Sequence, residues 1–181
     1  MHTLVRKTLE IYINEKRLIT QSDFPTDILP MMWKKESVFV TLYYDGKIIA
    51  SSWRIQCQKE NVVFECIDNT LLCLKDPRFT GTLQRKKKLK KIHIIVDLFA
   101  SEDRRMLQNI SELSVRNEWL IFLSQNLWLM SVVLPHMVHL DATPERYFDL
   151  ICQKLSLDPS KLTHSDYILY ALKTKEFTDM I

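Results

Sequence analysis

Glycine is so scarce in this chain that several classes of fold and site are excluded. The two glycines, Gly46 and Gly81, stand far apart, so neither G-x-G-x-x-G nor G-x-x-x-x-G-K-[ST] can be written. Nucleotide binding through either of those backbone cradles is therefore excluded. Gly46 follows Asp45 between two apolar runs, and Asp-Gly is a typical two-residue hairpin turn. The sequence thus predicts a β-hairpin with strands at 38–42 and 47–55.

Composition predicts one folded domain, or one domain with a small lobe. The 181 residues are 46% hydrophobic and 10% aromatic with a net charge of only +3, so the chain can bury a core and is not disordered. The N-terminus carries charge throughout and lacks the apolar segment of a signal peptide. The cysteines form no C-x-x-C pair, which predicts free thiols in a reducing, cytoplasmic compartment; they are Cys57, Cys66, Cys73 and Cys152.

One stretch needs to be tested against a membrane interpretation. Residues 119–140 contain no Asp, Glu, Lys or Arg and are numerous enough to span a bilayer. However, Ser124, Gln125 and Asn126 interrupt the apolar run. Because a polar trio between two apolar runs is typical of a turn, the stretch predicts a hairpin over 119–134. We therefore expect no contact with a membrane.

Hydrophobic periodicity and capping residues predict an α+β fold, with a mainly antiparallel β-sheet flanked by helices. Asn61 and Thr143 are the expected N-caps of two of the helices, and Ser101 is expected to cap a short helix that runs to Asn109. Residues 20–37 are expected to be loop-like. The main helices are predicted at 3–17, 61–75 and 144–155, and further strands at 91–99 and 167–172.

Several short segments, taken in order, resemble the AMMECR domain family, called AmmeMemoRadiSam system protein A in prokaryotes. They are VFVTL at 38–42, the DG turn at 45–46, DPRF at 76–79, the strand HIIVDLF, LP at 134–135 and PERYFDLICQKLSL at 144–157. The resemblance covers nearly the whole chain. It implies a larger lobe, a small lobe near 17–37 and 101–118, and a cleft between the lobes. It also implies a partner role beside a Memo-type protein and a radical SAM enzyme.

The chain departs from the family at the segment usually suspected of being functional. Relatives carry R-G-C-I-G on the strand after the DG turn, whereas this chain reads Ile49-Ala50-Ser51-Ser52-Trp53. Ser51 stands in the place of the cysteine, and Trp53 in the place of a glycine. Chemistry that needs the family thiol therefore cannot run here unchanged. We expect Trp53 to fill space that glycine leaves open in relatives, so that the strand has become structural.

The DPRF segment is the best remaining candidate for a site. Pro77 fixes the chain after a helix, and Phe79 is expected to anchor the segment in the core. Asp76 and Arg78 would then be presented rigidly to an anionic ligand or to a partner. The alternative is an internal Asp–Arg ion pair that shapes the turn. Both interpretations remain open at the level of the sequence.

A basic run is the second candidate. It could hold nucleic acid phosphates or an acidic partner, or it could be a solvated face of a loop. No aromatic pattern typical of RNA-binding domains flanks it in the sequence, which predicts weak and unselective binding of RNA. The run consists of Arg85, Lys86, Lys87, Lys88, Lys90 and Lys91, interrupted by Leu89.

Metal and thiol chemistry have weaker support. His136 and His139 lie near Asp141, but no C-x-x-C or H-E-x-x-H pattern accompanies them, so we expect no bound metal and no cofactor. Cys66 and Cys73 are spaced to share one helix face and are expected to be core residues. The four tryptophans are expected in the core or between lobes; they are Trp33, Trp53, Trp119 and Trp128.

These observations favour a non-catalytic binding or adaptor component that works with a protein partner. The first rival is an enzyme with a remodelled cleft around Ser51, Trp53, Asp76 and Arg78. The second rival is an RNA-binding domain that uses the basic run at 85–91.

Overall fold

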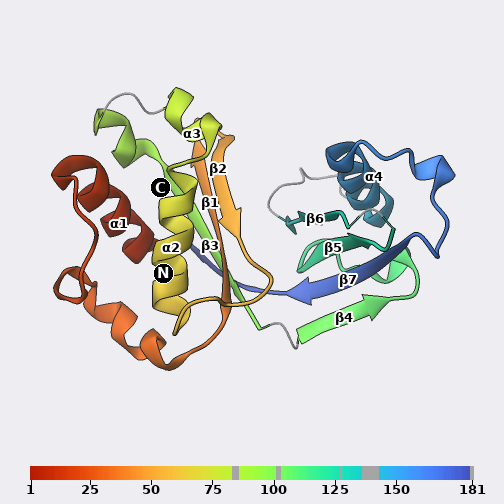
Figure 1. Ribbon diagram of the computed structural model, residues 1–181, viewed down its shortest axis with the longest axis horizontal. Helices are drawn as coiled ribbons and strands as arrows, with labels where there is room; N and C mark the ends of the chain where they lie inside the picture. Colours follow the sequence, from red (N-terminus) through yellow and green to blue (C-terminus); the bar gives the residue numbers. More distant parts are fainter. Residues whose placement is uncertain (83–85, 101–102, 127, 136–142, 180–181) are drawn as a thin grey trace. The chain divides into compact units, whose positions relative to one another are not determined.

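The computed structural model divides the chain into two compact units, which are described separately. The first unit comprises residues Met1–Ser101 and Lys175–Ile181, and the second comprises Glu102–Thr174 (Figure 1). The described residues form two four-stranded antiparallel sheets with helices, which confirms the predicted α+β class. The structure describes residues 1–82, 86–100, 103–126, 128–135 and 143–179, and the side chains among them except those of 81, 82 and 86–88.

The sheet of the first unit is built around the predicted hairpin. Strands β1 (Ser37–Tyr44) and β2 (Lys47–Trp53) pair through the Asp45-Gly46 turn, where both residues have positive φ, at 52° and 69°. Such values match a type I′ turn, which explains why Asp-Gly stands there. Strands β3 (His93–Phe99) and β8 (Lys175–Thr178) complete the order β2-β1-β3-β8. Because β2 is an edge strand, the groups along its outer side need other partners.

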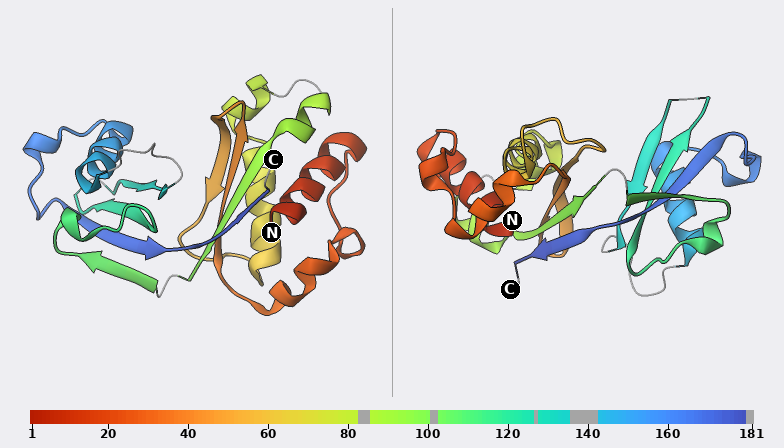
Figure 2. Two further views of the ribbon diagram at one scale, coloured as in Figure 1. Left: turned by 180° about the vertical axis from the view of Figure 1, so that it is seen from behind. Right: turned by 90° about the horizontal axis from the view of Figure 1, so that it is seen from below.

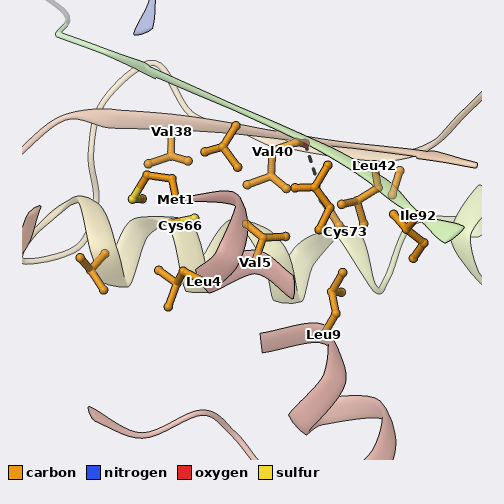
Figure 3. Packing of buried hydrophobic residues seen from close by; sticks show 14 of the residues in the cluster. Met1, Leu4, Val5, Leu9, Val38, Val40, Leu42, Cys66, Cys73 and Ile92 are labelled. Carbon is orange, nitrogen blue, oxygen red and sulfur yellow. Dashed lines mark hydrogen bonds between the residues drawn. The ribbon is translucent and has the colours of Figure 1, made fainter. Parts of the chain in front are cut away.

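Two helices cover one face of this sheet. The N-terminal α1 (His2–Glu15) and α2 (Val62–Cys73) both lie on that face, as the left view of Figure 2 also shows. Asn61 caps α2 as expected, because its Oδ1 accepts from the backbone N–H groups of Val63 and Phe64. Figure 3 shows the core between the layers, where the helices meet the inward-facing residues of β1; it includes Leu4, Val5, Leu9, Val38, Val40, Leu42, Cys66 and Cys73.

Short helices fill the remaining segments of the first unit. The region expected to be loop-like at 20–37 contains the 3₁₀ helices η1 (Gln21–Asp23) and η2 (Thr26–Trp33). Helix α3 (Pro77–Thr82) follows α2, and the 3₁₀ helix η3 (Lys86–Lys91) leads into β3.

The second unit has its own sheet and core. Strands β4 (Arg104–Leu107), β5 (Glu118–Ser124), β6 (Met130–Val133) and β7 (Tyr167–Lys173) form the order β4-β7-β5-β6. The β5–β6 pair confirms the hairpin predicted from the uncharged stretch. Helix α4 (Pro144–Leu155) begins at the expected cap Thr143, and short 3₁₀ helices lie at Ile110–Glu112 and Pro159–Lys161. Among the described residues, no helix is long and apolar enough to cross a membrane.

Several sequence-based expectations differ from the structure. The expected cap Ser101 lies outside the described residues, and the rest of the helix expected up to Asn109 contains the strand β4 instead, which pairs with the open edge of β7. Residues 17–37, expected in the small lobe, belong to the first unit, while the second unit runs on to Thr174. Trp33 and Trp128, expected in the core or between lobes, are not core residues, because they are 91% and 93% exposed.

A fully buried carboxylate holds β2 to α2. Glu65 is 0% exposed, and its Oε1 accepts from Arg54 Nη1 at 2.9 Å and Asn69 Nδ2 at 3.2 Å. Its Oε2 accepts from the backbone N–H groups of Gln58 and Lys59 at 2.8 and 3.0 Å. Buried charge is tolerated only when it is paired and hydrogen-bonded, and here both oxygens are satisfied. The carboxylate of one helix residue thus holds the end of β2 and the loop that follows it.

Candidate functional site

Three of the sequence-predicted site residues meet at the outer edge of β2. Ser51 comes from β2, while Asp76 and Arg78 come from the start of α3. Arg78 donates from Nη2 to Asp76 Oδ2 at 2.6 Å, from Nε to Asp76 Oδ1 at 3.0 Å, and from Nη2 to Ser51 Oγ at 3.2 Å. The backbone N–H of Ser51 donates to Asp76 Oδ2 at 3.4 Å. Asp76 therefore gives an edge-strand N–H group a partner, and Arg78 joins the two segments.

The local sequence explains why the DPRF segment is rigid. The carbonyl of Asp76 accepts from the N–H groups of Phe79 and Thr80, and its Oδ1 accepts from the N–H of Arg78 at 3.0 Å. Pro77 occupies the first turn of α3, where its missing N–H costs nothing. Phe79 is buried in the first core, as expected from the sequence. The helix start and the buried ring together fix the direction of Arg78.

Ser51, Asp76 and Arg78 are poorly suited to general acid–base catalysis. The hydrogen bond from Arg78 holds the pKa of the Asp76 carboxyl below its usual value, and the same bond raises the pKa of Arg78. A carboxyl with a lowered pKa is a weak base, and a guanidinium does not accept a proton. A serine nucleophile needs a neighbouring base, whereas Ser51 Oγ accepts a bond from a cation. The arrangement is suited to positioning and binding rather than to proton transfer.

The internal Asp76–Arg78 ion pair is one of the two alternatives that the sequence left open, and it is present. The side chain of Arg78 is nevertheless 52% exposed, while that of Asp76 is largely covered. One edge of the guanidinium shapes the turn, and the cation still faces solvent. Arg78 can therefore both shape the turn through its ion pair and present its guanidinium to a ligand or a partner.

The strand that replaces the family motif is packed on both faces. Ile49 and Ala50 are buried in the helix-covered core, and Ser52 Oγ donates to Asn69 Oδ1 of α2 at 2.8 Å. Trp53 is half-buried and stacks on Phe39 of β1, with ring centroids 5.8 Å apart and an interplanar angle of 12°. Phe39 and Trp53 are directly paired in the β1–β2 register, so the indole takes part in a cross-strand aromatic pair.

Sequence analysis missed a fully buried carboxylate of this region, Glu65. Its signal was present, because Glu65 and Asn69 stand four apart on the helix face that also buries Val62, Cys66 and Cys73. Arg54, which donates to Glu65, also donates from Nη2 to Asp68 Oδ2 at 2.6 Å. This polar cluster supports the strand that carries Ser51 without touching Ser51 itself.

The other candidates have separate outcomes. His136, His139, Asp141 and Arg85 lie outside the described residues, as do the side chains of Lys86, Lys87 and Lys88. Within the described part of the chain, no group of three His, Cys, Asp or Glu side chains could hold a metal ion. Lys90 and Lys91 are exposed.

The cysteine prediction is confirmed for Cys66 and Cys73, which are buried in the first core as free thiols. Burial raises the pKa of the Cys66 thiol to about 12 and also raises that of Cys73. Neither thiol is activated for nucleophilic chemistry.

We expect Trp53→Ala to lower the free energy of unfolding by about 2–3 kcal/mol, because it removes a half-buried indole from an aromatic pair. Trp33→Ala is the matched control and should change stability by less than about 0.5 kcal/mol, because that indole is exposed. Urea denaturation followed by circular dichroism measures both. Equal stability of the two variants would contradict a structural role for Trp53 and favour a ligand-facing ring.

Comparison with known proteins agrees with this architecture. A search of solved structures finds the uncharacterised protein PH0010 from Pyrococcus horikoshii, with a TM-score of 0.67 and 17% identity over 98% of this chain and 88% of that chain. At that identity the likeness shows the fold alone. No curated protein sequence matches the chain. The AMMECR1 family model matches residues 2–177, and the chain therefore belongs to the AMMECR1 family.

Proposed function

We propose that this domain is a non-catalytic, cytoplasmic binding component that acts through a protein partner. The observation that carries the proposal is the exposed indole of Trp33, at the end of η2 in the first unit. Tryptophan is the residue type most enriched among the dominant contacts of protein interfaces. Leu18 and Leu29, from the same segment between α1 and β1, are also exposed. These three large apolar side chains are exposed within one chain segment, which supports a contact surface at this segment.

The chemistry around Ser51 supports binding over catalysis. Where the resemblance places a cysteine, the hydroxyl of Ser51 accepts from Arg78, and the nearby Asp76 is engaged by the same guanidinium. The described cysteines are free thiols, which fits a reducing compartment. By resemblance to the prokaryotic members of the family, the partner is a Memo-type protein or a radical SAM enzyme.

Binding of the partner should depend on Trp33. We expect a complex of fixed stoichiometry between the purified chain and the Memo-type protein or the radical SAM enzyme of the same genome. Trp33→Ala should weaken it at least tenfold, because loss of an interface tryptophan typically costs 2 kcal/mol or more. Isothermal titration calorimetry measures the affinity.

The control is Trp128→Ala, which removes an equally exposed indole from the second unit and should leave the affinity unchanged. Undiminished affinity of Trp33→Ala would show that this segment is not the contact surface. A failure of both candidate partners to bind would remove the partner role that the resemblance implies.

The rival enzyme requires an activated Ser51, and a general fluorophosphonate probe labels such serines covalently. We expect no labelling of Ser51, because its hydroxyl faces a guanidinium instead of a base. Mass spectrometry of the treated protein is the measurement, with Ser51→Ala as the matched variant. Stoichiometric labelling that disappears in Ser51→Ala would establish a nucleophile and overturn the non-catalytic proposal.

A further inference from the structure

A cavity of about 770 Å³ lies at one end of the first sheet, apart from the Ser51 group. It is formed by two chain segments, namely the end of β1 with its tight turn and the junction of η3 with β3. The described residues that line it are Tyr43, Tyr44, Asp45, Gly46, Lys91 and His93. Nothing in the proposed partner role uses these residues.

One wall of the cavity is aromatic and held in place. Tyr43 and His93 are directly paired in the β1–β3 register, and their ring centroids lie 6.1 Å apart. The imidazole is held by a hydrogen bond between Nε2 and Thr178 Oγ1 at 3.2 Å, and its Nδ1 lies 2.9 Å from Asp179 Oδ1 without hydrogen-bond geometry. Burial raises the pKa of Tyr43 to about 12, so its phenol is neutral near pH 7. The result is an aromatic face, held in place by the sheet, on which a flat ring can stack.

The described lining of the cavity carries one cation and one anion, and two exposed lysines lie next to it in the chain, while Asp97 and Glu176 add negative charge near Tyr43. Lys91 lines the cavity, Lys90 precedes it and is exposed, and Lys47 is exposed opposite Tyr44 in the hairpin. Asp45 is the opposing charge in the lining. The carboxylate of Asp179, behind His93, is paired with Arg6 and therefore adds little negative potential. Lys91 is also the last residue of the basic run.

The cavity places aromatic rings next to a lysine of the basic run. No aromatic pattern typical of RNA-binding domains flanks the run in the sequence, yet folding brings Tyr43 and Tyr44 of β1 to the same cavity as Lys91. Aromatic rings next to lysines are the combination that binds single-stranded nucleic acids without a glycine-rich cradle, since bases stack on the rings and phosphates pair with the cations.

We propose that this cavity binds one nucleotide unit, with its base stacked on the tyrosine wall and its phosphate at Lys91. The same chemistry is offered by a free mononucleotide and by a nucleotide within single-stranded RNA. The experiment therefore uses both sources.

The first measurement compares three probes by fluorescence anisotropy with the whole chain at physiological salt. The probes are a labelled 12-nucleotide oligoadenylate, an abasic strand of the same length, and AMP as a competitor of the labelled strand. We expect the oligoadenylate to bind about tenfold or more tightly than the abasic strand, because stacking contributes about 1–3 kcal/mol per base. Equal affinity for both strands would reduce the site to a charged surface and overturn the proposal.

Substitutions of lining residues test whether the oligoadenylate binds in this cavity. Lys91→Gln should weaken binding and make the salt dependence shallower by about 0.7 in log–log slope, the value for one phosphate contact on a single strand. Lys35→Gln is the matched control, because Lys35 is exposed just before the opposite end of β1 and should leave affinity unchanged. Tyr43→Leu should abolish the preference for bases, and Tyr43→Phe should retain it. An unchanged affinity in Lys91→Gln would overturn the proposal even if Tyr43→Leu failed to fold.

Asp45→Asn provides a test in the opposite direction. Asparagine tolerates the positive φ of this position, so the turn should persist, while removal of the carboxylate lessens repulsion of phosphate. We expect affinity for the oligoadenylate to rise about two- to fivefold at low salt, and a fall would contradict the placement of the phosphate. Competition by AMP identifies the free nucleotide as a ligand, and binding of the strand without competition identifies RNA. Binding of neither probe would overturn the proposal.

Discussion

The buried carboxylate of Glu65 is the interaction on which the candidate site depends. An edge strand has one side without a neighbouring strand, so its position must be fixed by something other than a ladder of hydrogen bonds. In this protein Glu65 accepts from Arg54 directly after β2 and from two backbone N–H groups of the following loop. Ser52 of the same strand donates to Asn69, which in turn donates to Glu65. The position of β2, and with it that of Ser51, follows from this cluster.

With β2 fixed, the start of α3 completes its outer edge. Asp76 accepts from the backbone of Ser51, and Arg78 joins the hydroxyl to the carboxylate. Strand β2 is a packed element, with Trp53 stacked on Phe39 and Ala50 in the core. The guanidinium of Arg78 is therefore held in a defined place, and no base among the neighbours that the structure describes activates the hydroxyl of Ser51. A binding role therefore agrees better with the local chemistry than a nucleophilic one.

Local signals in the sequence predicted much of the fold. Asp45-Gly46 predicted the tight turn of the β1–β2 hairpin, and Asn61 and Thr143 were correctly predicted as helix caps. The polar residues 124–126 marked the turn between two strands. Features that depend on distant partners were not predictable. β4 forms because β7 has an open edge, and the cavity wall combines Tyr43 with Lys91 from another part of the chain. Within the candidate site, Ser51, Asp76 and Arg78 were proposed from motifs. The spacing of Glu65 and Asn69 was a signal in the sequence, but the other partners of Glu65 stand on another segment and could not be predicted.

The central claim is that the ion pair between Arg54 and the fully buried Glu65 holds β2 against α2. A double-mutant cycle with Glu65→Gln and Arg54→Gln, measured by urea denaturation, tests it most directly. We expect the two changes to be strongly non-additive, with a coupling energy of about 2 kcal/mol, because Arg54→Gln leaves the buried carboxylate of Glu65 without its counter-charge, whereas Arg54 keeps Asp68 in Glu65→Gln. Additivity within about 0.5 kcal/mol would show that the two side chains stabilise the fold independently and would contradict this account.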